Sequence, residues 1–207
     1  MQAMELLFSN TGIIAWGGVA IIILLIYAET GLLLGLVVPG GETLVFTAGL
    51  LASTNTLDIS IFLLLILLIA SGTAGDISGF YIGKKFGKKL YHKKDTWYFK
   101  QKYLQVAEDF LSKHSKLAII LGKFFPIVRP FTPVISGTTR FKFGSFISLS
   151  LVAVLLYMCI FCLGGYFLGK RFPQIENYLV WLLPVSIIVS LVPVVRQVRK
   201  YKAGQRI

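Results

Sequence analysis

Five ionisable side chains interrupt otherwise apolar stretches of this 207-residue chain. They are three carboxylates and two cations, namely Glu29, Glu42, Asp76, Lys123 and Arg129. One unpaired charge at the centre of a bilayer costs at least about 2.5–3.5 kcal/mol, so such residues pair with one another or face a cavity. An Arg guanidinium binds phosphate oxygens through two parallel hydrogen bonds, and a Lys ammonium binds them as a point charge. Anion binding and proton exchange are therefore the chemistry open to this set.

Two interpretations of these charges follow from the sequence. In the functional one, Lys123 and Arg129 bind an anionic headgroup, and Glu29, Glu42 or Asp76 takes up protons because burial disfavours an ionised carboxylate. In the structural one, buried ion pairs lock parts of the protein together. For Asp76, capping or hydrogen bonding at a glycine-rich kink is a further alternative. No nucleophile–base pair or metal-ligand set is visible, so we expect neither an enzyme nor a bound metal or cofactor.

The charged positions fall in or beside two apolar segments that must break. Segment 121–137, LGKFFPIVRPFTPVISG, contains three prolines at a spacing that no regular helix absorbs, and segment 30–53 breaks in its middle. The predicted turn residues are Pro39, Gly40, Gly41, Pro126, Pro130 and Pro133. At membrane depth, a broken backbone is tolerated only where it is buried in protein or lines a watery cavity. We therefore predict two re-entrant hairpins, at about 30–53 and 116–139.

Composition indicates a single membrane domain over residues 1–207. The chain is 56% hydrophobic, and its mean hydropathy is +0.76. The remaining long apolar stretches predict four membrane spans, at 11–28, 58–83, 143–169 and 173–195. The fold class expected is thus all-α and polytopic.

The distribution of charge predicts the orientation of these spans. The formal net charge is +12, and all 21 Lys and Arg residues lie at or after Lys84. Cations flank spans on the cytoplasmic side, which explains the charge without a nucleic-acid partner. We predict a cytoplasmic amphipathic segment at 84–115, a cytoplasmic tail at 196–207 and a cytoplasmic N-terminus.

Small residues within two of the spans predict close packing. Gly75, Gly79, Gly83 and Gly87 recur every fourth residue, which places glycine on one helix face and allows another helix to approach closely. Cys159 and Cys162 lie in an apolar run and are expected to be packed small residues rather than a redox or metal motif.

An internal repeat relates the two halves of the chain at an offset of 86–87 residues. Gly35-x3-Pro39-x2-Glu42 matches Gly122-x3-Pro126-x2-Arg129, and GFYIGKKF at 79–86 matches GYFLGKRF at 165–172. The unit is one hairpin followed by one span. Because a hairpin does not cross the membrane and a span does, consecutive copies have opposite orientation. This is the inverted-repeat arrangement of many secondary transporters.

Four motifs resemble the DedA family, the bacterial branch of the SNARE-associated or VTT-domain proteins. They are E-x-G-L-L from Glu29, PGGE at 39–42, GDISGFYIG at 75–83 and GKFFPIVRPFTPVISG at 122–137. The resemblance covers roughly residues 25–170. It implies a multi-pass protein of the bacterial inner membrane with two facing re-entrant hairpins and a role in moving lipids between leaflets.

The resemblance also implies substrates and site residues. Members are implicated in moving undecaprenyl phosphate or phospholipids such as phosphatidylethanolamine, some with dependence on the proton motive force. The important acids of the family carry over to Glu29 and Glu42, and its basic residues to Lys123 and Arg129. Position 123 is usually Arg in that motif and is Lys here. Because Lys is a point charge and lacks the planar fork of Arg, the headgroup preference of this protein can differ from that of its relatives.

We therefore predict a flippase for a phosphate-bearing lipid, with proton coupling and oligomeric state left open. One alternative is a proton-coupled transporter of a small soluble ion or drug. The other is a membrane-integrity factor that transports nothing.

Overall fold

The computed structural model describes residues 10–31, 41–54, 57, 59–91, 101–125, 128–139 and 141–172. These residues form helices joined by turns, which confirms the predicted all-α class. In chain order the helices are α2 (Asn10–Gly31), α3 (Gly41–Ser53), α4 (Ile61–Tyr91), α5 (Gln101–Gly122), α6 (Phe131–Thr138), α7 (Phe143–Met158), the π-helical turn η2 (Cys159–Leu163) and α8 (Gly164–Arg171).

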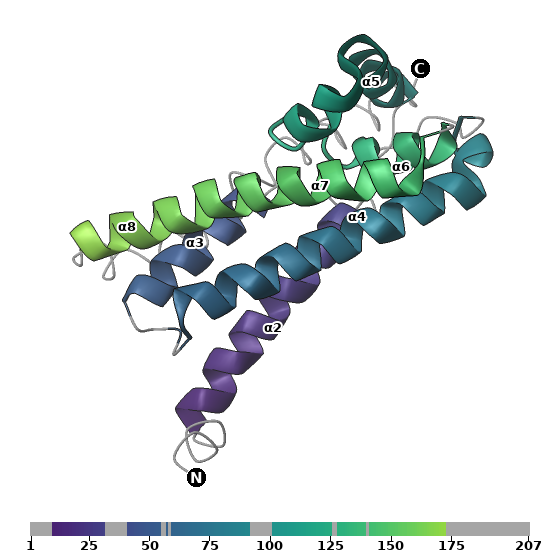
Figure 1. Cartoon of the computed structure of the whole chain (residues 1–207). Coiled ribbons are helices and arrows are strands. Elements are labelled where there is room, and N and C mark those ends of the chain that lie inside the picture. Colours follow the sequence, from purple (N-terminus) through teal and green to yellow (C-terminus); the bar gives the residue numbers. More distant parts are fainter. Residues whose placement is uncertain are drawn as a thin grey trace, which may run out of the picture.

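Two long helical rods dominate the arrangement: α4 is one, and α7, η2 and α8 together form the other. Figure 1 shows α7, η2 and α8 as one continuous rod that runs beside α4, with α3 packed near its α8 end and α6 at the opposite end. Helix α2 crosses α4, and α5 covers α6 and α7. The two short helices α3 and α6 thus lie at opposite ends of the same pair of rods.

Both rods are long and apolar enough to cross a membrane. The qualifying stretches are Ile61–Gly87 and Phe143–Arg171, of 27 and 29 residues, with mean hydropathy 2.0 and 2.7. At 1.5 Å per residue each spans about 40 Å, more than the hydrocarbon core of a bilayer. Their outer faces expose large apolar side chains such as Phe62, Ile66 and Phe167, as expected of surfaces that lipid covers.

The other predicted spans are only partly covered by the described residues. The stretch predicted at 11–28 lies within α2, a continuous helix of 22 residues. The span predicted at 173–195 and the tail at 196–207 lie outside the described residues. The four-span topology therefore stays a prediction.

Several helix boundaries differ from the sequence-based ones. Helix α2 continues past Glu29 to Gly31, and α4 continues through the lysines after Gly83 to Tyr91. The segment predicted at 84–115 as one surface helix is therefore divided between the end of α4 and the start of α5. Helix α5 then runs without a break from this amphipathic part into the apolar stretch that ends at Gly122.

The glycine face of α4 makes the close approach that its spacing predicted. A Cβ on Gly79 would lie 3.0 Å from the ring of Pro133, and one on Gly83 would overlap the backbone of Val134. In return, a Cβ on Gly137 would overlap the backbone of Phe80. Helices α4 and α6 are therefore in backbone contact, which any larger side chain would prevent.

The second rod repeats this packing with α3. A Cβ on Gly165 of α8 would overlap the backbone of Phe46 in α3. Gly165 follows Gly79 by 86 residues, and Pro133, which Gly79 meets, follows Phe46 by 87. Each short helix therefore packs on the long helix of the other half, and this reciprocal packing agrees with the repeat found in the sequence.

We expect Gly83→Ala to lower the free energy of unfolding by about 1–3 kcal/mol, because the added methyl group overpacks the α4–α6 contact. The matched control is Gly17→Ala, also inside a helix but with no described atom within 4 Å of the new Cβ, which should be neutral or stabilising by up to about 1 kcal/mol. Thermal unfolding in detergent compares the variants. Equal melting temperatures would contradict the close approach.

Candidate functional site

Arg129 is the centre of the larger charge cluster. Its Nη1 donates to Glu42 Oε1 at 3.3 Å and to the Tyr157 hydroxyl at 2.6 Å, and it lies 3.7 Å from Glu29 Oε1. The Arg129 side chain is 5% exposed, whereas those of Glu29 and Glu42 are 13% and 32% exposed. The cation is therefore buried behind two carboxylates that remain partly accessible.

The turn before α6 positions Arg129. Its backbone N–H donates to the Phe125 carbonyl at 2.8 Å, and Pro130 follows as the N-cap of α6. Pro130 and Pro133 occupy the start of a helix, where the missing N–H would have no intrahelical partner. Two of the predicted turn prolines thus begin a helix, while Pro126 lies outside the described residues.

Glu29 and Glu42 meet at the start of α3. The Glu29 carboxylate accepts a hydrogen bond from the Gly41 backbone N–H, and a Cβ on Gly41 would lie 2.8 Å from the carboxyl carbon of Glu29. Glu42 lies in the first turn of α3, where a negative charge is favoured by exposed backbone N–H groups. Gly41 thus leaves the space that Glu29 occupies. The other predicted turn residues here, Pro39 and Gly40, lie outside the described residues.

The contact between Glu42 and Arg129 joins equivalent positions of the repeat. The two residues are 87 positions apart, the offset that relates the two halves. In an inverted repeat, a pseudo-two-fold axis relates the two halves. Equivalent positions of the two halves can touch only near that axis. The reciprocal packing of α3 and α6 describes the same relation, so the charge cluster lies where the two halves meet.

Tyr157 belongs to this cluster and was not predicted from the sequence. Besides accepting a hydrogen bond from Arg129, its ring lies 4.3 Å from the guanidinium carbon, a cation–π contact. Ser150, also missed, lies seven residues earlier on the same face of α7. This spacing of two hydroxyl groups on one face of an apolar span is the signal that would have indicated them.

Asp76 and Lys123 form a second, fully buried cluster. Lys123 Nζ lies 2.7 Å from Asp76 Oδ1, and the Ser150 hydroxyl donates to Asp76 Oδ2. All three side chains are buried. Asp76 is therefore held by an ion pair and a hydroxyl group that join α4, the end of α5 and α7.

The two clusters are electrostatically connected. The charges of Arg129 and Glu29 both act on the Lys123 ammonium. With all groups ionised, three carboxylates face two cations and leave one excess negative charge. In this conformation all five predicted charged residues are brought together in ion pairs. The side chains of both cations, Lys123 and Arg129, are buried.

Potential metal or redox groups are not gathered in the part of the chain described. No group of three His, Cys, Asp or Glu side chains there is placed to hold a metal ion. Both cysteines are free, and Cys162 is fully buried in η2, where its backbone packs on Gly49. This confirms that Cys162 is a packed small residue.

Comparison with known proteins identifies the family. The family model "VTT domain" matches residues 38–167. Escherichia coli Protein DedA is 33% identical over 183 residues, which cover 88% of this chain and 83% of that protein. The chain belongs to the DedA family. The matched region of this DedA-family chain contains every residue of both charge clusters except Glu29.

Other relatives are membrane proteins by name. An uncharacterized membrane protein of Mycobacterium leprae is 35% identical over 171 residues, covering 83% of this chain and 75% of its own length. The E. coli inner membrane protein YabI is 28% identical over 151 residues, covering 72% and 57%. No solved structure matches the chain. This DedA-family chain is therefore a membrane protein, as its exposed apolar helices indicate.

We expect Lys123→Met to lower the free energy of unfolding by about 3–5 kcal/mol, because it leaves the Asp76 carboxylate buried without its cation. The double variant Lys123→Met with Asp76→Asn should recover most of the loss. Asp109→Asn, an exposed site on α5, is the control and should be neutral. Thermal unfolding in detergent measures all three, and a double variant no more stable than the single one would argue against the pair.

Proposed function

We propose that this protein moves a phosphate-bearing lipid, such as undecaprenyl phosphate or a phospholipid, between the leaflets of the bacterial inner membrane. The observation that carries the proposal is that one buried guanidinium, that of Arg129, is shared by two carboxylates from different helices. Family membership supports a role in the membrane. A buried cation with exchangeable anionic partners is suited to bind another anion in their place.

Proton uptake provides a way to exchange those partners. While Glu29 and Glu42 are both ionised, they neutralise Arg129 and exclude a third anion. Protonation of either removes one negative charge, so a phosphate can approach the guanidinium without repulsion from two carboxylates. The side chains of Glu29 and Glu42 are both partly exposed, whereas that of Arg129 is buried.

The guanidinium keeps donors for such a ligand. Among the described residues, the buried Arg129 Nε has no hydrogen-bond acceptor. A phosphate that bridges Nε and a terminal nitrogen would make the two parallel hydrogen bonds that Arg forms with phosphate. Tyr157 stacks on the guanidinium and would hold its plane in place during the exchange.

Lys123 contributes to the same proposal through its position. Its ion pair with Asp76 fixes the end of α5, and direct headgroup binding by Lys123 requires this pair to open. The structural interpretation of buried ion pairs thus suits Lys123 and Asp76 best, whereas the functional one suits Arg129. We further propose that the protein has four membrane spans, two re-entrant hairpins and cytoplasmic termini, and that it catalyses no reaction.

Arg129→Gln should lower the rate of phosphate-lipid translocation in proteoliposomes by about 10–150-fold, the loss of a charge-assisted hydrogen bond worth about 1.5–3 kcal/mol. Arg129→Lys should recover only part of the rate, because Lys lacks the planar fork. Lys116→Gln removes an exposed cation and is the control. Full activity of a monodisperse Arg129→Gln protein would rule out the role. Uptake of a soluble anion without lipid movement would favour a solute transporter.

The translocation rate of the wild-type protein should rise as pH falls, because protonation of a carboxylate beside Arg129 makes room for the phosphate. Glu42→Gln imitates the protonated side chain and should keep substantial activity with a flattened pH profile. Glu108→Gln, on α5, should retain the wild-type profile. The translocation rate in proteoliposomes is measured as a function of pH. If Glu29→Gln and Glu42→Gln both leave this pH profile unchanged, proton coupling at this site is refuted.

A further inference from the structure

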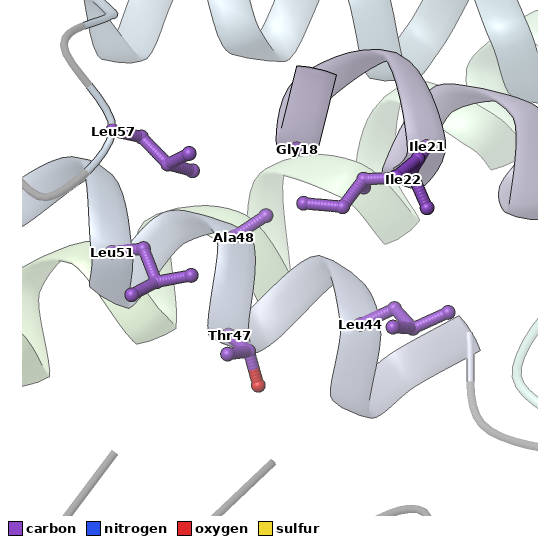
Figure 2. Close-up of a pocket in the computed structure, with 8 residues that line it drawn as sticks. All are labelled: Gly18, Ile21, Ile22, Leu44, Thr47, Ala48, Leu51 and Leu57. Atoms are coloured by element: carbon purple, nitrogen blue, oxygen red, sulfur yellow. The ribbon is translucent and has the colours of Figure 1, made fainter. Parts of the chain in front are cut away.

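A pocket of about 230 Å³ lies between α2 and α3, apart from the contacts of the charge clusters. Figure 2 shows side chains from both helices and from the turn before α4 directed into it. Its lining residues are Gly18, Ile21, Ile22, Leu44, Thr47, Ala48, Leu51 and Leu57. Of these, only Thr47 carries a polar side-chain atom. A buried water needs two to four polar partners, so the pocket suits an apolar occupant.

The surroundings of the pocket decide which apolar molecule can reach it. The pocket is open on one side, and Ile21 at its edge is 60% exposed. On the next turn of α2, Leu24 and Leu25 are also exposed. In a membrane protein, an exposed apolar helix face is expected to lie against hydrocarbon. Lipid chains are therefore the apolar molecules available to this pocket.

The second half of the protein fills the equivalent space with its own side chains. Leu44 and Ala48 correspond to Phe131 and Ile135 at the repeat offset of 87. Phe131 and Ile135 are fully buried and pack with Leu104 and Ala107 of α5. Side chains at these positions thus fill the α5–α6 interface, whereas the α2–α3 interface keeps a pocket.

The pocket and the charge cluster lie along the same face of α2. Gly18, Ile22, Ile26 and Glu29 follow one face of that helix, and Glu29 lies about 10 Å beyond Ile22 at 1.5 Å per residue. Ile26, fully buried, separates the apolar pocket from the ion pairs. A phosphate at Arg129 and an apolar chain in the pocket therefore lie within the length of one lipid molecule.

We propose that this pocket binds a hydrocarbon chain of a membrane lipid. The assignment of that lipid as the phosphate lipid that Arg129 takes up rests on the proposed function. The protein then holds its lipid substrate at two points. The phosphate headgroup binds at Arg129, where the two halves meet, and one hydrocarbon chain lies between α2 and α3. The chain site belongs to the first half alone, because Phe131 closes its equivalent.

Two adjacent glycines provide a matched test. A Cβ on Gly18 would lie 3.8 Å from Leu57, an ordinary van der Waals distance, so a larger side chain there enters the pocket without meeting backbone. A Cβ on Gly17 has no described atom within 4 Å. Gly18→Leu should therefore fill the pocket, and Gly17→Leu should add the same side chain to the same helix outside it.

The probe is phosphatidic acid with a photoreactive diazirine near the end of one acyl chain, added to the full chain in nanodiscs. We expect wild-type protein and Gly17→Leu to be labelled at 44–51, as mapped by mass spectrometry. Labelling of Gly18→Leu should fall about tenfold, the effect of displacing about two methylene groups from an apolar site. Both variants should match the wild type in size-exclusion profile.

Equal labelling of the two variants, or label spread evenly along the exposed face of α2, would overturn the chain site. A covalent dimer formed through a photoreactive amino acid at Leu51, in place of a lipid adduct, would assign the pocket to a second copy and also overturn it. Pocket labelling in a protein that translocates no lipid would uphold the chain site and reject the proposed function. Translocation without pocket labelling would reject the chain site alone.

Discussion

The need to neutralise buried charge determines much of this structure. The side chains of Arg129 and Lys123 are buried, and each is tolerated only because acidic partners approach from other helices. Those partners come from α2, α3 and α4, and hydroxyl groups of α7 complete both clusters. The ends of α2 and α5 and the starts of α3 and α6 are therefore held close to one another, although most of the surrounding surface is apolar.

Glycine packing makes this convergence possible. The short helices approach the long rods to backbone contact, at Gly83 and Gly137 for α6 and at Gly49 and Gly165 for α3. Without side chains in these interfaces, the charged starts of the short helices can reach the centre of the molecule. Close packing at the rods and charge pairing at the centre thus depend on each other.

The sequence was sufficient for the all-α class, the glycine face and the family, because each depends on residue type and spacing. It did not indicate which acid pairs with which cation, since pairing depends on how helices cross. Tyr157 and Ser150 were missed because a hydroxyl group in an apolar span has many uses. The pocket beside Gly18 was not predicted because it arises from volume that no described side chain fills. The boundaries of α4 and α5 were missed because a continuous helix can carry both an apolar and a charged stretch.

The contact between Glu42 and Arg129 has a consequence for how the two halves can be related. At an axis of pseudo-symmetry, a side chain faces its own counterpart. A chain assembled from two copies of either half would bring Glu against Glu or Arg against Arg where the two halves meet. Neither half can therefore replace the other. In a perfectly symmetric ancestor with Glu or Arg at both equivalent positions, two like charges would have faced and repelled each other.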